Sequence, residues 1–258
     1  MEILGYVGAL FIGLVLGLTG GGGSILTVPI LVYLMSINPV TATAYSLFIV
    51  GTTSTFGAIQ NYRKNLVDIK NGFIFAIPSF IAVYLTRKFI VPRIPEIIIE
   101  SPILITKETF LMLFFAVIMV FGALSVLKKK SQNTNSEEKR NLFLIGIQTF
   151  TIGIIIGLVG AGGGFLIIPS LILFAKLPMR KAVGTSLFII AMNSLVGFIG
   201  DVQNLEIDWI FLLTFSAISV VGIFIGMYLT KYTNESQLKK IFAYFVLVMA
   251  AIILLKEM

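Results

Sequence analysis

Long apolar segments separated by short polar loops run through most of the chain. Six of them approach the roughly 20 residues that an α-helix needs to cross a bilayer. They extend over about 41–61, 70–90, 104–127, 181–200, 208–230 and 237–255. Their apolar residues do not alternate with polar ones, which favours helices over barrel strands, and lipid admits only these two solutions. The pattern indicates an all-α polytopic membrane protein.

The first apolar segment is too long for one span and is interrupted by glycines at 20–23. Its pieces, about 3–18 and 25–36, would be about 24 and 18 Å long at 1.5 Å per residue. Neither comfortably crosses a hydrocarbon core of about 30 Å. The same interruption recurs at Gly160–Gly164. Each broken segment is either one kinked span or a hairpin, and the hairpin is either re-entrant or made of two short tilted spans.

The two broken segments belong to an internal repeat. A shift of 140 residues places Gly17–Gly23 on Gly157–Gly163 and Ser46–Ile49 on Ser186–Ile189. Shared hydrophobic composition would match scattered Leu and Ile, but it would not match this set of Gly and Ser positions. The chain is therefore predicted to consist of two homologous halves.

Each half is predicted to hold one broken segment and three spans. The halves are residues 1–127 and 141–258, and the charged segment 128–140 joins them as a solvated linker. If each broken segment returns to the face where it starts, 14 of the 19 basic residues lie on one side of the membrane; otherwise the split is 9 to 10. Basic loops collect in the cytoplasm. This bias favours the return and places 128–140 in the cytoplasm and loop 201–208 outside the inner membrane.

A returning segment followed by three spans crosses the membrane an odd net number of times. The second half then starts on the opposite face from the first, which gives an inverted-topology repeat. Such repeats are a hallmark of secondary transporters. We expect the two breaks to enter from opposite faces and to meet near the midplane.

Composition narrows the classes of function. Only 12% of the 258 residues are charged, against roughly 25% in soluble domains. Cysteine and histidine are absent, so we expect no disulfide, cofactor or metal site. The net charge of +7 is assigned to cytoplasmic loops rather than to nucleic-acid binding. Neither a nucleophile–base pair nor a phosphate loop is found, so no enzyme is predicted.

The glycine breaks predict an anion site. A half-helix would start near Ser24 and another near Gly164 or Phe165, each with unpaired N–H groups and the positive end of its dipole at the break. Glycine lets a ligand approach the backbone closely. Pro29 and Pro169, which lack an N–H, are expected in the first helical turns.

No charged residue is expected within a span core, because Arg87 is assigned to an outer loop, 87–108, and Asp201 to loop 201–208. A cation carrier usually needs a buried carboxylate, so this absence favours an anion held by dipoles and hydroxyl groups. The candidate substrate-binding residues are Thr19, Gly20, Gly22, Gly23, Ser24, Ser46, Gly160, Gly162, Gly163, Gly164, Ser186 and Asn193.

A structural role for the same residues is the alternative. Glycine clusters in membrane helices permit close packing, and an anion site requires a cavity beside the breaks. Ser46 and Ser186 equally fit bonds to their own helix carbonyls. Asn193 fits a bond between helices. Gly222 and Gly226 form a GxxxG pattern that favours packing.

The doubled motif G-L-x-G-x-G-G-x-x-x-x-x-P, followed by A-x-x-x-S-L-F, resembles the TauE/SafE sulfite exporter family. It is carried by Gly17, Leu18, Gly20, Gly22, Gly23, Pro29, Ala42 and Ser46, and again by Gly157, Leu158, Gly160, Gly162, Gly163, Pro169, Ala182 and Ser186. The resemblance covers essentially the whole chain. It implies a multi-pass membrane protein that exports sulfite, sulfoacetate or related sulfur-containing organic anions.

The leading hypothesis is an exporter of sulfite or an organosulfonate that works by alternating access around the two glycine breaks. Its partners would be this small anion and the lipid bilayer. Two other hypotheses stay open. One is a channel for a small neutral solute, which would also need no charges in its spans. The other is a membrane assembly or sensor protein that transports nothing.

Overall fold

The computed structural model describes residues 2–99, 105–127, 142–160, 162–230, 232 and 235–257. Helices make up most of these residues. The elements are α1 (Glu2–Thr19), α2 (Ser24–Pro29), the π-helix η1 (Ile30–Leu34), α3 (Pro39–Arg63), α4 (Ile69–Leu85), the π-helix η2 (Thr86–Ile90), α5 (Val91–Arg93), β1 (Ile97–Ile99), β2 (Ile105–Thr106), α6 (Lys107–Leu127), α7 (Leu142–Val159), α8 (Gly164–Phe174), α9 (Met179–Asp201), α10 (Trp209–Leu229) and α11 (Glu235–Glu257).

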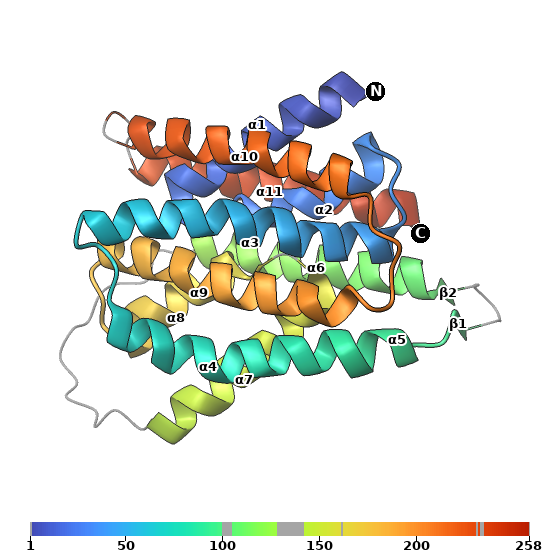
Figure 1. The fold of residues 1–258 in the computed structure, drawn as a ribbon, viewed down its shortest axis with the longest axis horizontal. Coiled ribbons are helices and arrows are strands. Elements are labelled where there is room, and N and C mark those ends of the chain that lie inside the picture. Colours follow the sequence, from blue (N-terminus) through green and yellow to red (C-terminus); the bar gives the residue numbers. More distant parts are fainter. Residues whose placement is uncertain are drawn as a thin grey trace.

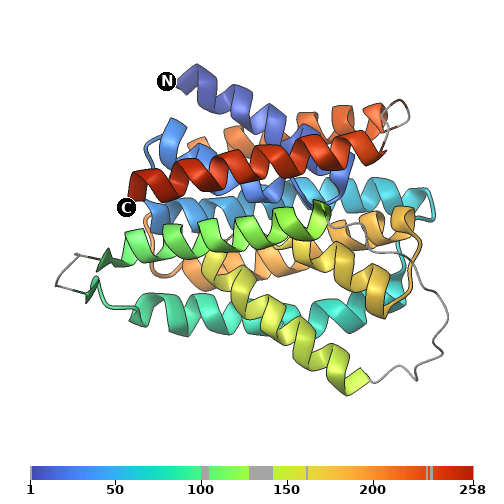
Figure 2. The same ribbon diagram turned by 180° about the vertical axis from the view of Figure 1, so that it is seen from behind.

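The long helices run roughly along the longest axis of the molecule, so the bundle has two ends (Figures 1 and 2). We call one the β-hairpin end, because β1 and β2 lie there beside the start of α3 and the end of α9. We call the other the Arg63 end, because α3 ends there and α9 begins there. The linker 128–140 lies outside the described residues.

The two broken segments start at opposite ends of the bundle (Figures 1 and 2). Helix α1 runs from the β-hairpin end to the middle, and α2 with η1 runs back to the same end. Helix α7 starts at the Arg63 end, and α8 returns to it. The half-helices begin at Ser24 and Gly164, where the sequence predicts them.

Contacts between helices recur at the 140-residue spacing of the sequence repeat. The backbone N–H of Asp68 donates to the hydroxyl of Thr185 (2.9 Å), and that of Asp208 donates to the hydroxyl of Tyr45 (2.7 Å). Asp68 and Asp208 also cap the first turns of α4 and α10 through their carboxylates. A Cβ on Gly57 would touch Ile223 and Leu187, and one on Gly197 would touch Val83 and Leu47.

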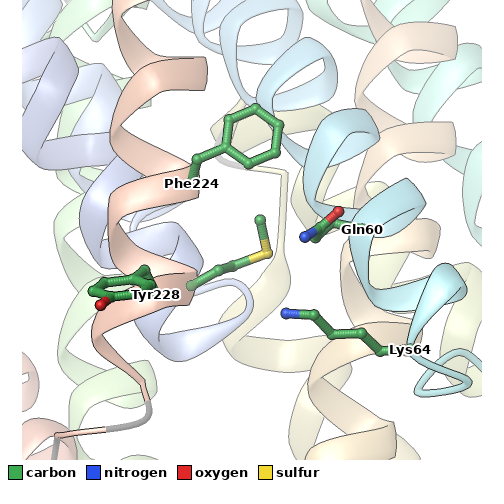
Figure 3. Close-up of a pocket in the computed structure, with 5 residues that line it drawn as sticks. Gln60, Lys64, Phe224 and Tyr228 are labelled. Carbon is green, nitrogen blue, oxygen red and sulfur yellow. The ribbon is translucent and has the colours of Figure 1, made fainter.

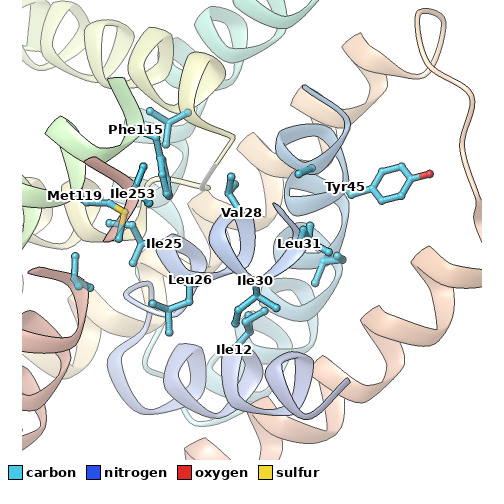
Figure 4. Packing of buried hydrophobic residues seen from close by; sticks show 14 of the residues in the cluster. Ile12, Ile25, Leu26, Val28, Ile30, Leu31, Tyr45, Phe115, Met119 and Ile253 are labelled. Atoms are coloured by element: carbon cyan, nitrogen blue, oxygen red, sulfur yellow. The ribbon is translucent and has the colours of Figure 1, made fainter. Parts of the chain in front are cut away.

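Helices α3 and α9 pack against each other at the centre, α1 packs on α10, α4 on α7, and α6 on α11. A large apolar cluster surrounds α2 and includes Ile12, Val28 and Phe115 (Figure 4). Large apolar side chains also lie on the outside, such as Ile210, which is 82% exposed. An apolar exterior is what a lipid solvent requires.

Four helical stretches in the described part of the chain are long and apolar enough to cross a membrane. They are Ile69–Arg93, Lys107–Leu124, Met179–Asp201 and Trp209–Leu229. The first and third are longer than the sequence pattern predicts. Helix α4 continues through η2 and α5, so Arg87 lies in a helix and not in a loop, and Asp201 is the last residue of α9.

The outer loop contains a two-stranded antiparallel sheet, in which Ile97 pairs with Thr106, and the class stays all-α. One smaller expectation needs correction. Pro29 and Pro169 lie inside α2 and α8, beyond the first turn in which their missing N–H would have no cost. Pro29 is followed directly by the π-helix η1, a wider turn that can accommodate a lost hydrogen bond.

Candidate functional site

Most polar groups of the first glycine break form hydrogen bonds within the break or with the end of α1. Gly20 has a φ of +76°, a conformation that favours glycine. The hydroxyl of Thr19 donates to the carbonyl of Val15 (2.8 Å) and accepts from the N–H of Gly22 (2.9 Å). The hydroxyl of Ser24 donates to the carbonyl of Gly21 (2.7 Å). Thr19 and Ser24 thus hold the shape of the turn in this state.

The start of α2 is a tight turn rather than a set of free donors. The N–H groups of Ser24, Ile25 and Leu26 donate to the carbonyls of Gly21, Gly22 and Gly23, over 3.4, 3.3 and 3.1 Å. Such i to i−3 bonds are weakly aligned. In this conformation the first turn of α2 has its donors already engaged.

The second break has a more contorted backbone. Gly160, Gly162 and Gly163 have φ values of +71°, +63° and +71°. The N–H groups of Leu166 and Ile167 share the Gly163 carbonyl, over 2.9 and 3.1 Å. Because α8 begins at this break and returns to the Arg63 end, the positive end of its dipole is directed toward the middle of the bundle.

The two breaks pack directly against each other. A Cβ on Gly21 would lie 2.6 Å from the Cα of Gly164, so the two backbones touch. A Cβ on Gly162 would lie 2.7 Å from Val50 and 3.0 Å from the hydroxyl of Ser194. The sequence argument for an anion site asked for a cavity beside the breaks, whereas these glycines meet close neighbours. Packing therefore accounts for part of the glycine pattern.

Ser46 and Ser186 occupy matching positions in α3 and α9 and differ in their bonds. The Ser186 hydroxyl lies 2.6 Å from the Gly20 carbonyl and 2.8 Å from the Val183 carbonyl. The Ser46 hydroxyl is buried and has no hydrogen-bond partner among the described residues. An unsatisfied buried hydroxyl costs free energy. Ser46 is thus a donor with spare capacity, and it lies in α3 between Thr43 and Val50, which contact Gly160 and Gly162 of the second break.

Asn193 joins α9 to α4. Its carbonyl oxygen lies 2.9 Å from the hydroxyl of Ser79, whose single proton is shared with the Phe75 carbonyl at 2.8 Å. The amide nitrogen of Asn193 is buried and has no partner in the described part of the chain. Asn193 thus bonds between helices, as one of the two sequence interpretations expects, and it retains a second polar group.

The structure adds a charged residue that the sequence analysis missed. Arg87, in η2, is 1% exposed. Its Nη1 donates to the Thr43 hydroxyl (3.0 Å) and lies 3.3 Å from Oδ2 of Asp201. A Cβ on Gly160 would lie 2.5 Å from Nη2 of Arg87, so the guanidinium packs on the second break. Its Nε and Nη2 have no hydrogen-bond partner among the described residues.

The expectation that the span cores hold no charge is therefore wrong. Both Arg87 and Asp201 are buried, at 1% and 4% exposure, and they neutralise each other. Asp201 thus supplies the buried carboxylate that was taken as missing. The repeat carried a signal, because the 140-residue shift places Arg87 on Met227 and Asn61 on Asp201.

The neutral counterpart of the ion pair lies at the Arg63 end. There the Asn61 amide lies 3.6 Å from the Met227 sulfur. Beside Met227 is a cavity of about 280 Å³, which α3 and α10 line (Figure 3). The other lining residues are Gln60, Lys64, Phe224 and Tyr228. The bundle is thus hollowed at the Arg63 end, while the matching position near the β-hairpin end holds a closed ion pair.

Helices of membrane length, an apolar exterior and two broken hairpins define a multi-pass helical membrane protein. The sequence profile of the family described as "Sulfite exporter TauE/SafE" matches residues 6–253. The chain belongs to this family.

Several relatives are described as "probable membrane transporter protein". One, from Xylella fastidiosa (strain 9a5c), is 26% identical over 246 residues, covering 93% of this chain and 89% of the relative. YjnA from Bacillus subtilis (strain 168) is 28% identical over 244 residues, covering 93% and 94%. YunE from the same strain is 27% identical over 233 residues, covering 79% of each. The comparisons support a membrane transporter. No solved structure matches the chain.

Proposed function

We propose that the protein is a secondary transporter that exports a small anion, sulfite or an organosulfonate, by alternating access around the two glycine breaks. One observation carries the proposal. The breaks belong to hairpins that start at opposite ends of the bundle, and they touch through bare backbone at Gly21 and Gly164. Broken helices that meet between inverted repeats form the substrate site in many secondary transporters.

The packed contact is interpreted as the closed position of the pathway. Gly21 and Gly164 carry no side chain, so the two hairpins can separate and re-form the contact without repacking a core. On separation the positive ends of α2 and α8 would face a shared space. The spare donors of Ser46 and Asn193 would be available to the same anion.

The charges of the loops support an orientation with the Arg63 end, and the cavity there, toward the cytoplasm. The basic residues of the loops beside this end, including Lys64, Lys176 and Arg180, follow the positive-inside rule. The protein would then be hollowed toward the cytoplasm and closed toward the outside. With the cytoplasm negative, export of an anion is downhill by about 2.3 kcal/mol per charge per 100 mV.

Sulfite and organosulfonates are the proposed substrates because the family description names sulfite export. Their compact oxyanion groups can accept several hydrogen bonds at once, which suits converging N–H and hydroxyl donors.

Flux from proteoliposomes tests the proposal. Vesicles containing the purified protein are loaded with sulfite or 2-hydroxyethanesulfonate, and efflux is followed at zero potential and at an imposed inside-negative potential. We expect efflux above that of protein-free vesicles, accelerated by the negative interior. If neither anion shows such efflux, both are removed from the substrate list. Flux of a neutral solute that ignores the potential would support a channel instead.

A further inference from the structure

The guanidinium of Arg87 has donors that its contacts within the protein do not use. Burying a guanidinium is costly unless its charge is paired and its donors are bonded. Asp201 supplies the charge at 3.3 Å, but Nε and Nη2 remain without partners in the described part of the chain. The hydroxyl of Thr86, the residue before it, is also buried and unpartnered. Of these spare donors, Nη2 of Arg87 lies against Gly160 in the second break, and the Thr86 hydroxyl lies beside Gly157 in α7.

We propose that Arg87 binds the transported anion on the β-hairpin side of the glycine breaks, and that Asp201 takes the place of this anion when none is bound. The inference rests on the proposed function and specifies a charged residue for it. The ligand class is a small oxyanion with at least two acceptor oxygens. A planar guanidinium matches such a group bidentately.

The geometry gives each partner of Arg87 a separate role. Thr43 holds Nη1 from α3, so the side chain stays anchored when Asp201 leaves. Asp201 is the last residue of α9, where a small movement of the helix end would separate the carboxylate from the guanidinium. An incoming sulfonate or sulfite would bond the spare Nε and Nη2 and would take over from Asp201, which contacts Nη1, the neutralisation of the guanidinium charge.

The ion pair of Arg87 and Asp201 has no charged counterpart at the equivalent positions of the repeat. Met227 and Asn61, the counterparts of Arg87 and Asp201, carry no charge. A bound anion therefore meets a fixed cation only between the breaks and the β-hairpin end, within the described residues. Lys64, which lines the cavity at the Arg63 end, is exposed and suits capture of the anion rather than its desolvation.

The native tryptophan offers a direct measurement of binding. Trp209 is the only Trp in the chain, and its ring lies edge-on to that of Phe198, 6.1 Å between centroids. Phe198 lies one turn before Asp201 in α9. In the purified full-length protein we expect sulfite and 2-hydroxyethanesulfonate to change Trp209 fluorescence with saturation. Dimethyl sulfone, a neutral sulfur–oxygen compound, should leave it unchanged.

Substitutions then assign the binding to Arg87. The double variant Arg87→Gln/Asp201→Asn removes both charges, which keeps the site neutral, and should weaken anion binding by about 10-fold or more because a charge-assisted bond is lost. Asp201→Asn alone should strengthen binding by about 10-fold, since the internal competitor is gone. Arg93→Gln removes an exposed charge six residues further along and should stay within about twofold of wild type.

The results separate this inference from the proposed function, provided that efflux is measured on the same variants. If the double variant binds and exports anions like the wild type, Arg87 is not the ligand and anion export stands. If the wild type neither binds nor exports any anion tested, the proposed function and this inference both fail. If the double variant does not fold, Arg87→Lys is measured instead. Lysine keeps the positive charge but lacks the two parallel N–H donors of the guanidinium, so we expect weaker binding. Unchanged binding would overturn the assignment of Arg87 as a bidentate ligand.

Discussion

At the scale of the residue, the contact between the two glycine breaks depends on the absence of two side chains. Gly21 and Gly164 approach so closely that any Cβ on one enters the backbone of the other. We expect Gly21→Ala to cost about 1–3 kcal/mol through overpacking and to lower sulfite efflux. Thermal unfolding of the purified protein and vesicle flux measure the two effects.

Gly146→Ala is the matched control for Gly21→Ala. A Cβ at Gly146, in α7, would meet nothing within 4 Å. Its unfolding temperature should equal or slightly exceed that of wild type, because alanine favours the helix. Equal effects of the two substitutions would contradict the assignment of Gly21 to a backbone contact.

Thr19 offers a second test at this scale. Its hydroxyl accepts the buried N–H of Gly22. Thr19→Val keeps the shape but leaves that N–H unbonded, so we expect a loss of about 1–3 kcal/mol of stability. Thr214→Val, at an exposed position where the hydroxyl bonds only its own helix, should change stability by no more than about 0.5 kcal/mol. A Thr19→Val protein as stable as Thr214→Val would show that Thr19 does not hold the break together.

At the scale of the element, the sequence predicts the helices well and the ends of two of them poorly. The glycine clusters mark both breaks because no unbroken helix accommodates such runs. The predicted span 70–90 stops three residues before the helical stretch does, at Arg93, and Arg87 is assigned to a loop because its charge lowers the local hydropathy. Arg87 is buried because it pairs with Asp201 in the other half of the chain. The sequence around Arg87 therefore does not predict its burial. The repeat comparison of Arg87 with Met227 was the one available signal.

The contact between α1 and α10 is another long-range feature that a local sequence pattern predicts only in part. The Gly222 and Gly226 pattern predicts close packing, and the structure confirms it, since a Cβ at either would enter the backbone of α1. The partner helix was not predictable from the pattern. The contact between Gly21 and Gly164 is also long-range: the inverted-repeat argument predicts that the two breaks meet, but it does not identify this pair of residues. The bond from Thr19 to Gly22 spans three residues and follows from local turn chemistry.

The cavity between α3 and α10 gives a prediction for a pair of elements. Gln60→Trp should fill it, because Gln60 lines the cavity wall and indole is much larger than the amide. If this cavity is the cytoplasmic mouth, efflux should fall by roughly 10-fold, a barrier increase of about 1.4 kcal/mol. Ile59→Trp, the exposed neighbouring position, should leave efflux within about twofold. Equal flux in the two variants would place the pathway elsewhere.

At the scale of the whole molecule, the proposed orientation can be tested without background labelling, because the chain contains no cysteine. Lys64 and Asn204 are exposed and occupy equivalent repeat positions near opposite ends. A membrane-impermeant maleimide should label Asn204→Cys in intact cells or spheroplasts. It should label Lys64→Cys only after the membrane is permeabilised. The reverse pattern would invert the orientation and with it the assignment of the cavity to the cytoplasm.

The single-sided ion pair has a consequence for the resting protein. Two identical halves would make the two facing states mirror images of equal free energy. Arg87 and Asp201 remove that equality, since separating them costs more than separating Met227 from Asn61. Under the proposed alternating access, the protein without substrate would therefore spend most of its time with its cavity open on the side where Lys64 lies, and binding of the anion would remove this preference.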